Sequence, residues 1–126
     1  MMTRASGAIA LLVTGLALGT AAPVSAQASG WGDNYADGSV TVPTDRSSIR
    51  VCDSKSDNRS YKAVWHNDNP VDARKPFEVR APQGGCATDS SVWGSIKVFK
   101  LCYGHLGANK QVTWDGCKAA VWPGGH

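Results

Sequence analysis

Four cysteines constrain the fold more than any other feature of this sequence: Cys52, Cys86, Cys102 and Cys117. In a small exported chain, an even number of cysteines predicts disulfides, here two. A structural zinc site is the alternative, but the sequence has no C-x-x-C pair and its three histidines lack ligand spacing. Three connectivities are possible. We favour Cys52–Cys86 with Cys102–Cys117, because sequential pairing keeps each loop local.

Export is predicted by residues 1–28. Arg4 precedes an apolar run over 8–22, and a small-x-small sequence follows, which is typical of a signal peptide cleaved after Ala26 or Ala28. An uncleaved membrane anchor is the alternative. The Gly, Thr, Ser and Pro content of the run and its cleavage-like end favour secretion into the extracellular space.

The mature chain has about 100 residues, enough for one domain. Removal of Arg4 leaves 12 basic against 10 acidic residues, a formal charge of +2. These charges are interspersed, whereas nucleic-acid binding needs a concentrated basic face. No second apolar segment follows. We therefore expect neither nucleic-acid nor membrane partners, and look to other secreted proteins.

Residues 40–126 are predicted to form a disulfide-braced β domain. Short runs rich in Val, Ile, Trp and Tyr alternate with turn-forming stretches, and helical periodicity is nearly absent. The runs are "SVTV", "SIRVCD", "SYKAVWH", "FEVR", "SIKVFKLCYG", "QVTW" and "CKAAVW". The fifth run is apolar on both faces, as in a central strand. An all-β fold follows, a small antiparallel β-sandwich or open barrel.

Residues 29–39 are predicted to be a flexible, extended N-terminal arm, because Gly, Asp, Asn and Ser dominate and no periodicity is present. A role in partner binding is suggested for five of them: Trp31, Gly32, Asp33, Asn34 and Tyr35. Burial of the two aromatics is worth roughly 8–10 kcal/mol. Ordering about ten residues costs as much, so the arm needs a second contact made by the folded body.

No catalytic, cofactor or metal site is predicted. There is no G-x-S-x-G, glutamate occurs once, and His66, His105 and His126 have no neighbours that complete a catalytic group. The segment 33–39 begins like a calcium loop, but Tyr35 stands at the third position, which needs an oxygen ligand in an EF-hand, and Thr44 stands at the twelfth, which needs glutamate. Core or half-buried packing is expected for four tryptophans: Trp65, Trp93, Trp114 and Trp122.

The cysteine pattern resembles that of small exported actinobacterial proteins. "VCDSKSDNRSYKAVW", a downstream cysteine and "KVFKLCYGHLGANKQVTWDGCKAAVW" carry the resemblance, which spans Val40 to Trp122. One such set is the adaptor subunit of umbrella toxin particles. That resemblance implies a non-enzymatic adaptor that joins a large repeat-bearing toxin to a lectin subunit of degenerate trypsin-like fold. The arm would dock in the lectin's cleft, with Trp31 and Tyr35 as anchors.

A secreted inhibitor of an extracellular hydrolase is the alternative function. Compact two-disulfide domains commonly present a rigid loop, and either the segment from His66 to Phe77 or the turn that contains Cys86 is suited to this role. Arg74 and Lys75 would fit a trypsin-like pocket, although exposed basic loop residues are usually only solvated. A protease or an amylase would be the target.

Overall fold

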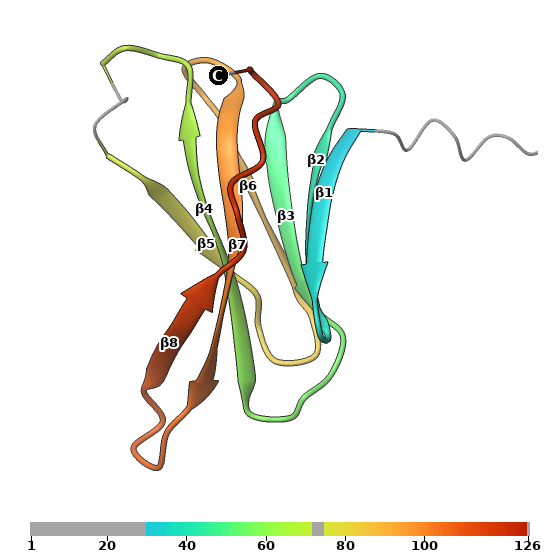
Figure 1. Ribbon diagram of the computed structural model, residues 1–126, viewed down its shortest axis with the longest axis vertical. Helices are drawn as coiled ribbons and strands as arrows, with labels where there is room; N and C mark the ends of the chain where they lie inside the picture. The colour runs from blue at the N-terminus through green and yellow to red at the C-terminus, as the bar shows by residue number, and fades with distance from the viewer. Residues whose placement is uncertain (1–29, 72–74, 126) are drawn as a thin grey trace, which may run out of the picture.

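Two four-stranded antiparallel sheets face each other in the computed structural model, which describes residues 30–71 and 75–125 (Figure 1). One sheet has the order β1-β2-β3-β6 and the other β5-β4-β7-β8. The strands are β1 (Gly30–Tyr35), β2 (Gly38–Pro43), β3 (Ser48–Asp53), β4 (Arg59–Asn67), β5 (Phe77–Arg80), β6 (Cys86–Ser90), β7 (Ile96–Leu106) and β8 (Val112–Cys117). The predicted all-β fold is confirmed, and of the two architectures the sandwich is the one found.

The core lies between the inner faces of the two sheets. Strand alternation sends every second residue of β2, β3 and β4 inward. Trp65 and Phe99 are each 1% exposed, and the Trp65 ring stacks on Phe77 at a centroid distance of 4.5 Å. Each large side chain that is fully buried contributes about 1.5–3 kcal/mol through the hydrophobic effect. This burial holds the two sheets together.

The turn between β1 and β2 is docked onto the opposite sheet through Tyr61. A Cβ at Gly38 would lie 2.2 Å from a ring carbon of this tyrosine, so only glycine fits there. The Tyr61 hydroxyl accepts a hydrogen bond from the backbone N–H of Asp37 at 3.3 Å. The first hairpin is therefore fixed to the sandwich at its tip.

Both predicted disulfides are confirmed. Cys52 of β3 bonds to Cys86 of β6, and Cys102 of β7 bonds to Cys117 of β8. In each case the two cysteines are direct cross-strand partners. Each bond thus attaches an edge strand to its neighbour within one sheet and fixes the register of that pair.

Three details of the predicted strands are wrong. Residues 30–35 are extended but form β1, paired with β2 along its whole length, where a flexible arm was expected. "CATDS" forms β6, although its turn-forming residues predicted a loop. "CKAAVW" contributes only the end of β8 and one bridge between Val121 and Phe99. The sequences of β1 and β6 do not by themselves favour strands. Both segments form strands because pairing with their neighbours satisfies their backbone hydrogen bonds.

The predicted signal peptide, residues 1–28, and the first residue of the arm lie outside the described residues. Within residues 30–71 and 75–125 the structure contains no helix that is long and apolar enough to cross a membrane. The two disulfides are of the kind found in proteins of oxidising compartments, which is compatible with an extracellular location.

Candidate functional site

The predicted anchors of the arm pack against their own domain. Trp31 is half-buried against the core, and Tyr35 stacks on Tyr103 of β7 with ring centroids 4.0 Å apart. Alternation along β1 places both aromatics on the inner face of the sheet. Tyr35 keeps 39% of its surface exposed. Their first role is therefore to hold β1 against the opposite sheet.

The other three predicted residues lie along the free edge of the sandwich or beside it. Lys118 pairs with Asp33 at 3.3 Å, and its Nζ also donates to the backbone oxygen of Asn34 at 3.3 Å. The Asn34 N–H donates to the carboxylate of Asp33 at 2.9 Å. Gly32 presents its backbone at the same edge, because β2 is the only described strand that pairs with β1.

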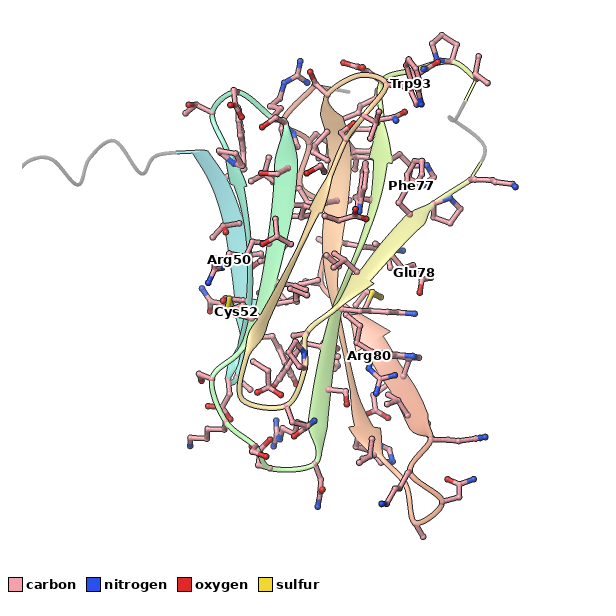
Figure 2. The ribbon with its side chains drawn as sticks, turned by 180° about the vertical axis from the view of Figure 1, so that it is seen from behind. Arg50, Cys52, Phe77, Glu78, Arg80 and Trp93 are labelled. Atoms are coloured by element: carbon pink, nitrogen blue, oxygen red, sulfur yellow. A yellow bond between two sulfur atoms is a disulfide. The ribbon has the colours of Figure 1, made fainter. Side chains whose placement is uncertain are left out.

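A second surface was not predicted from the sequence. Three hydrophobic side chains on two loops are largely exposed: Val71 at 86%, Val92 at 74% and Trp93 at 71%. We call them the end-loop patch. Figure 2 shows Trp93 at the end of the molecule, beyond Phe77 of β5. The expectation that Trp93 is core or half-buried is wrong, whereas Trp65 is buried and Trp114 and Trp122 are half-buried.

The two loops of the end-loop patch are rigidly joined. The Asp68 N–H donates to the backbone oxygen of Ser95, and the Ser95 N–H donates to a carboxylate oxygen of Asp68, both at 3.0 Å. Arg46 lies 3.8 Å from Asp68 and donates to the backbone oxygen of Ile96 at 3.2 Å. Gly94 has a φ of 132°, which allows the close approach of the loops. The exposed tryptophan is therefore carried on a braced support.

Beside the patch is a cavity of about 270 Å³. It is lined by Trp65, Asn67, Phe77, Ser90, Val92 and Trp93. Trp65 is 1% exposed, and its indole N–H finds no acceptor within residues 30–71 and 75–125. The cavity is thus lined mainly by aromatic and aliphatic side chains, with Asn67 and Ser90 as its polar members.

Charges near the patch are held in place by local hydrogen bonds. The Ser47 hydroxyl donates to Asp45 at 2.8 Å and, with the Ser47 backbone N–H, lowers the pKa of that carboxyl. Asp45 precedes Arg46, the residue that braces the loops. In the part of the chain that the structure describes, no three His, Cys, Asp or Glu side chains come together as metal ligands would.

The histidines occupy different settings. His66 is half-buried on β4, and His105 forms a 2.9 Å contact through Nδ1 with Asp115 of β8. The sequence did not reveal this pair, because a register shift in the β7–β8 ladder brings the two residues together. His126 lies outside the described residues.

Comparison with protein-family models, with curated proteins and with solved structures finds no match to this chain. The surfaces of the molecule itself are therefore the basis on which a function can be assigned.

Proposed function

We propose that this protein is a secreted, non-enzymatic binding module that links other extracellular proteins, as the resemblance to umbrella-toxin adaptors implies. The observation that carries the proposal is the end-loop patch. A tryptophan that is 71% exposed contributes little to the stability of its own monomer. Tryptophan is enriched among the residues that dominate protein–protein binding energies. Contact with a partner would therefore explain why Trp93 is exposed on a braced loop.

An adaptor needs a second contact, and the free edge of β1 provides it. Lys118 covers this edge at Asn34. At Gly30 and Gly32, no strand among residues 30–71 and 75–125 pairs with the outer side of β1, so an extended segment of a partner can add to the sheet there. The sequence predicted that a flexible arm docks in a partner's cleft. We propose instead that β1, as an edge strand, forms main-chain hydrogen bonds with the partner. β1 and β6, which leads to the patch, lie at opposite edges of their sheet, so two partners can bind together.

The test is capture of secreted proteins from culture supernatant by Trp93→Ala and the unchanged protein, with identification by mass spectrometry. Loss of a central anchor costs at least about 2 kcal/mol, or roughly thirtyfold in affinity. We expect Trp93→Ala to lose one captured protein and to retain a second. The matched control is Trp114→Ala. Trp114 is half-buried on β8, in the sheet β5-β4-β7-β8. Equal capture by Trp93→Ala would contradict the proposal.

Hydrolase inhibition is the second candidate, and one observation favours it. The loop after β4 starts with two successive side-chain turns: Asn67 accepts from the Asn69 N–H at 3.1 Å, and Asn69 accepts from the Val71 N–H at 2.9 Å. Lys75 is exposed, and Arg74 lies outside the described residues. Inhibition of a serine protease or an amylase at nanomolar concentration, abolished by Lys75→Ala, would favour this function.

A further inference from the structure

A pocket of about 290 Å³ lies at the other end of the sandwich from the end-loop patch. We call it the tyrosine pocket. Its lining comes from four strands and consists of Tyr35, Arg59, Tyr61, Tyr103, Gly104, His105 and Asp115. Figure 1 shows the β7–β8 hairpin extending beyond the β1–β2 turn at this end. Inner-face residues of β7 and β8 are therefore open to solvent here.

Close strand packing shapes the pocket. Arg59 pairs with His105 across the β4–β7 ladder, and Tyr61 pairs with Tyr103. In the β7–β8 ladder the register shifts between Tyr103 and Gly104, and a Cβ at Gly104 would lie 2.3 Å from the Thr113 oxygen. The irregularity thus depends on glycine. It brings the side chain of Asp115 to His105.

The pocket offers hydrogen-bonding groups of both kinds. His105 uses Nδ1 to contact Asp115 at 2.9 Å, and its other ring nitrogen has no partner within the described ranges. Asp115 has a second carboxylate oxygen, and its side chain is 45% exposed. The side chain of Tyr61 raises the pKa of Arg59, with smaller contributions from Asp57 and Asp37, so the guanidinium stays charged. A donor and an acceptor thus face one small space.

Aromatic surface adjoins these polar groups. The rings of Tyr35 and Tyr103 are stacked with an angle of 12° between their planes. Tyr103 covers one side of Tyr35, which is nevertheless 39% exposed. Because Tyr35 also lines the pocket, it supplies aromatic surface on which apolar C–H groups of a ligand can pack. Small-molecule sites commonly join such a surface to a few fixed polar groups.

The charges decide which ligand fits. An anion would approach Arg59 but would meet Asp115, with Asp37 and Asp57 acting on the same guanidinium. A cation would approach Asp115 but would meet Arg59. A neutral ring with neighbouring hydroxyls can accept from the guanidinium and donate to the carboxylate while its C–H face lies on Tyr35. The volume, close to the lower limit of roughly 300 Å³ for small-molecule pockets, suits one such ring.

We propose that the tyrosine pocket binds one neutral sugar ring, with Tyr35 as the stacking platform and Arg59, His105 and Asp115 as hydrogen-bonding groups. The site is separate from the end-loop patch. The two lie at opposite ends of β4, whose nine residues span about 26 Å. Sugar binding and protein binding are therefore independent properties that separate variants can remove.

Nuclear magnetic resonance on the purified, nitrogen-15-labelled secreted protein tests the proposal. The probes are methyl β-D-glucopyranoside, methyl α-D-mannopyranoside, methyl β-D-galactopyranoside and N-acetylglucosamine, with sodium acetate as the anion and tetramethylammonium chloride as the cation. We expect at least one sugar to shift the amide signals of Tyr35, Gly104 and Asp115 in a saturable way. A Kd near 1 mM corresponds to about −4 kcal/mol, a plausible affinity for so small a ligand.

Two variants assign the groups. Asp115→Asn removes the charged acceptor, and Tyr35→Ala removes the platform. Asp115→Asn should weaken sugar binding at least about tenfold, since hydrogen bonds to charged groups contribute roughly 1.5–3 kcal/mol. Tyr35→Ala should also weaken it, because the aromatic surface under the sugar ring is lost. Asp89→Asn on β6 is the control and should bind normally, as should Trp93→Ala. The proposal is overturned if no sugar shifts these signals, if only an ion does, or if Asp115→Asn binds as the unchanged protein does.

Discussion

The environment of a single residue decides its role in this protein, as two tryptophans show. Trp65 alternates inward on β4 and is 1% exposed, whereas Trp93 lies on a loop and is 71% exposed. Both directly follow a valine in the sequence. Burial depends on which strand faces which sheet. A local pattern therefore cannot distinguish a core tryptophan from one available to a partner.

Asp53 is the buried carboxylate with the clearest consequence for stability. It is 1% exposed; one carboxylate oxygen accepts from the Lys55 N–H at 3.1 Å, and the other has no partner in residues 30–71 and 75–125. Burial raises the pKa of Asp53 above its usual 3.8. The folded state therefore holds this proton more tightly than the unfolded state does.

We predict that Asp53→Asn changes the pH dependence of stability. In the unchanged protein, the contribution of Asp53 is fully present below about pH 3.8 and is lost as the pH rises through the raised pKa. Asparagine has no such loss. Urea unfolding between about pH 3 and pH 7 should show the variant gaining stability relative to the unchanged protein as pH rises, by about 1.4 kcal/mol for each unit of the pKa shift. A constant difference would refute the assignment.

At the scale of elements, the proposed function depends most on whether β1 is an ordered strand. Its sequence predicts disorder, but the chain supplies three tertiary contacts that order it. These are the ladder with β2, the stacking of Tyr35 on Tyr103, and the pair between Asp33 and Lys118. The ion pair is partly exposed and contributes little by itself. Most of the ordering comes from the ladder and the aromatic contacts.

Two substitutions on β1 distinguish an ordered strand from a flexible arm. We expect Trp31→Ala to lower the free energy of unfolding by about 1–3 kcal/mol, because this side chain packs against the core. Asn34→Ala, on the exposed face of the same strand, should change it by less than about 0.5 kcal/mol. Urea midpoints provide the measurement. Similar small effects of both changes would mean that β1 is not docked in solution.

At the scale of the whole molecule, the disulfides and the core have different tasks. The core joins the two sheets, while each disulfide holds an edge strand within its own sheet. The bonds close sequence separations of 34 and 15 residues, which corresponds to about 4 and 3 kcal/mol in the chain-entropy model. A typical total stability of about 5–15 kcal/mol makes these contributions decisive.

We therefore predict that Cys52→Ala with Cys86→Ala destabilises the protein by about 4 kcal/mol, and Cys102→Ala with Cys117→Ala by about 3 kcal/mol. Denaturant unfolding without reductant gives both values. In the second variant, amide exchange should rise first in β8, whose covalent link to β7 is gone. Unchanged stability in both variants would show that the core alone suffices.

The sequence by itself determined the all-β class, the sandwich as one of two architectures, the presence of two disulfides and the central position of β7, and it favoured the observed disulfide pairing among three. The class, the architectures and the central strand follow from local properties, namely side-chain alternation and β-branched residues, and the two disulfides follow from the even number of cysteines. Local properties act over a few residues and survive in any arrangement of the strands.

Only the tertiary structure decided that β1 is an ordered edge strand, that Trp93 is exposed, and that Arg59, His105 and Asp115 meet. Each of these depends on which strands become neighbours and in what register, and a shift of one residue reverses the face of every side chain. The register shift beside Gly104, which places Asp115 against His105, is such a case. Contacts between residues distant in the sequence carry the proposed binding sites, so no local pattern could reveal them.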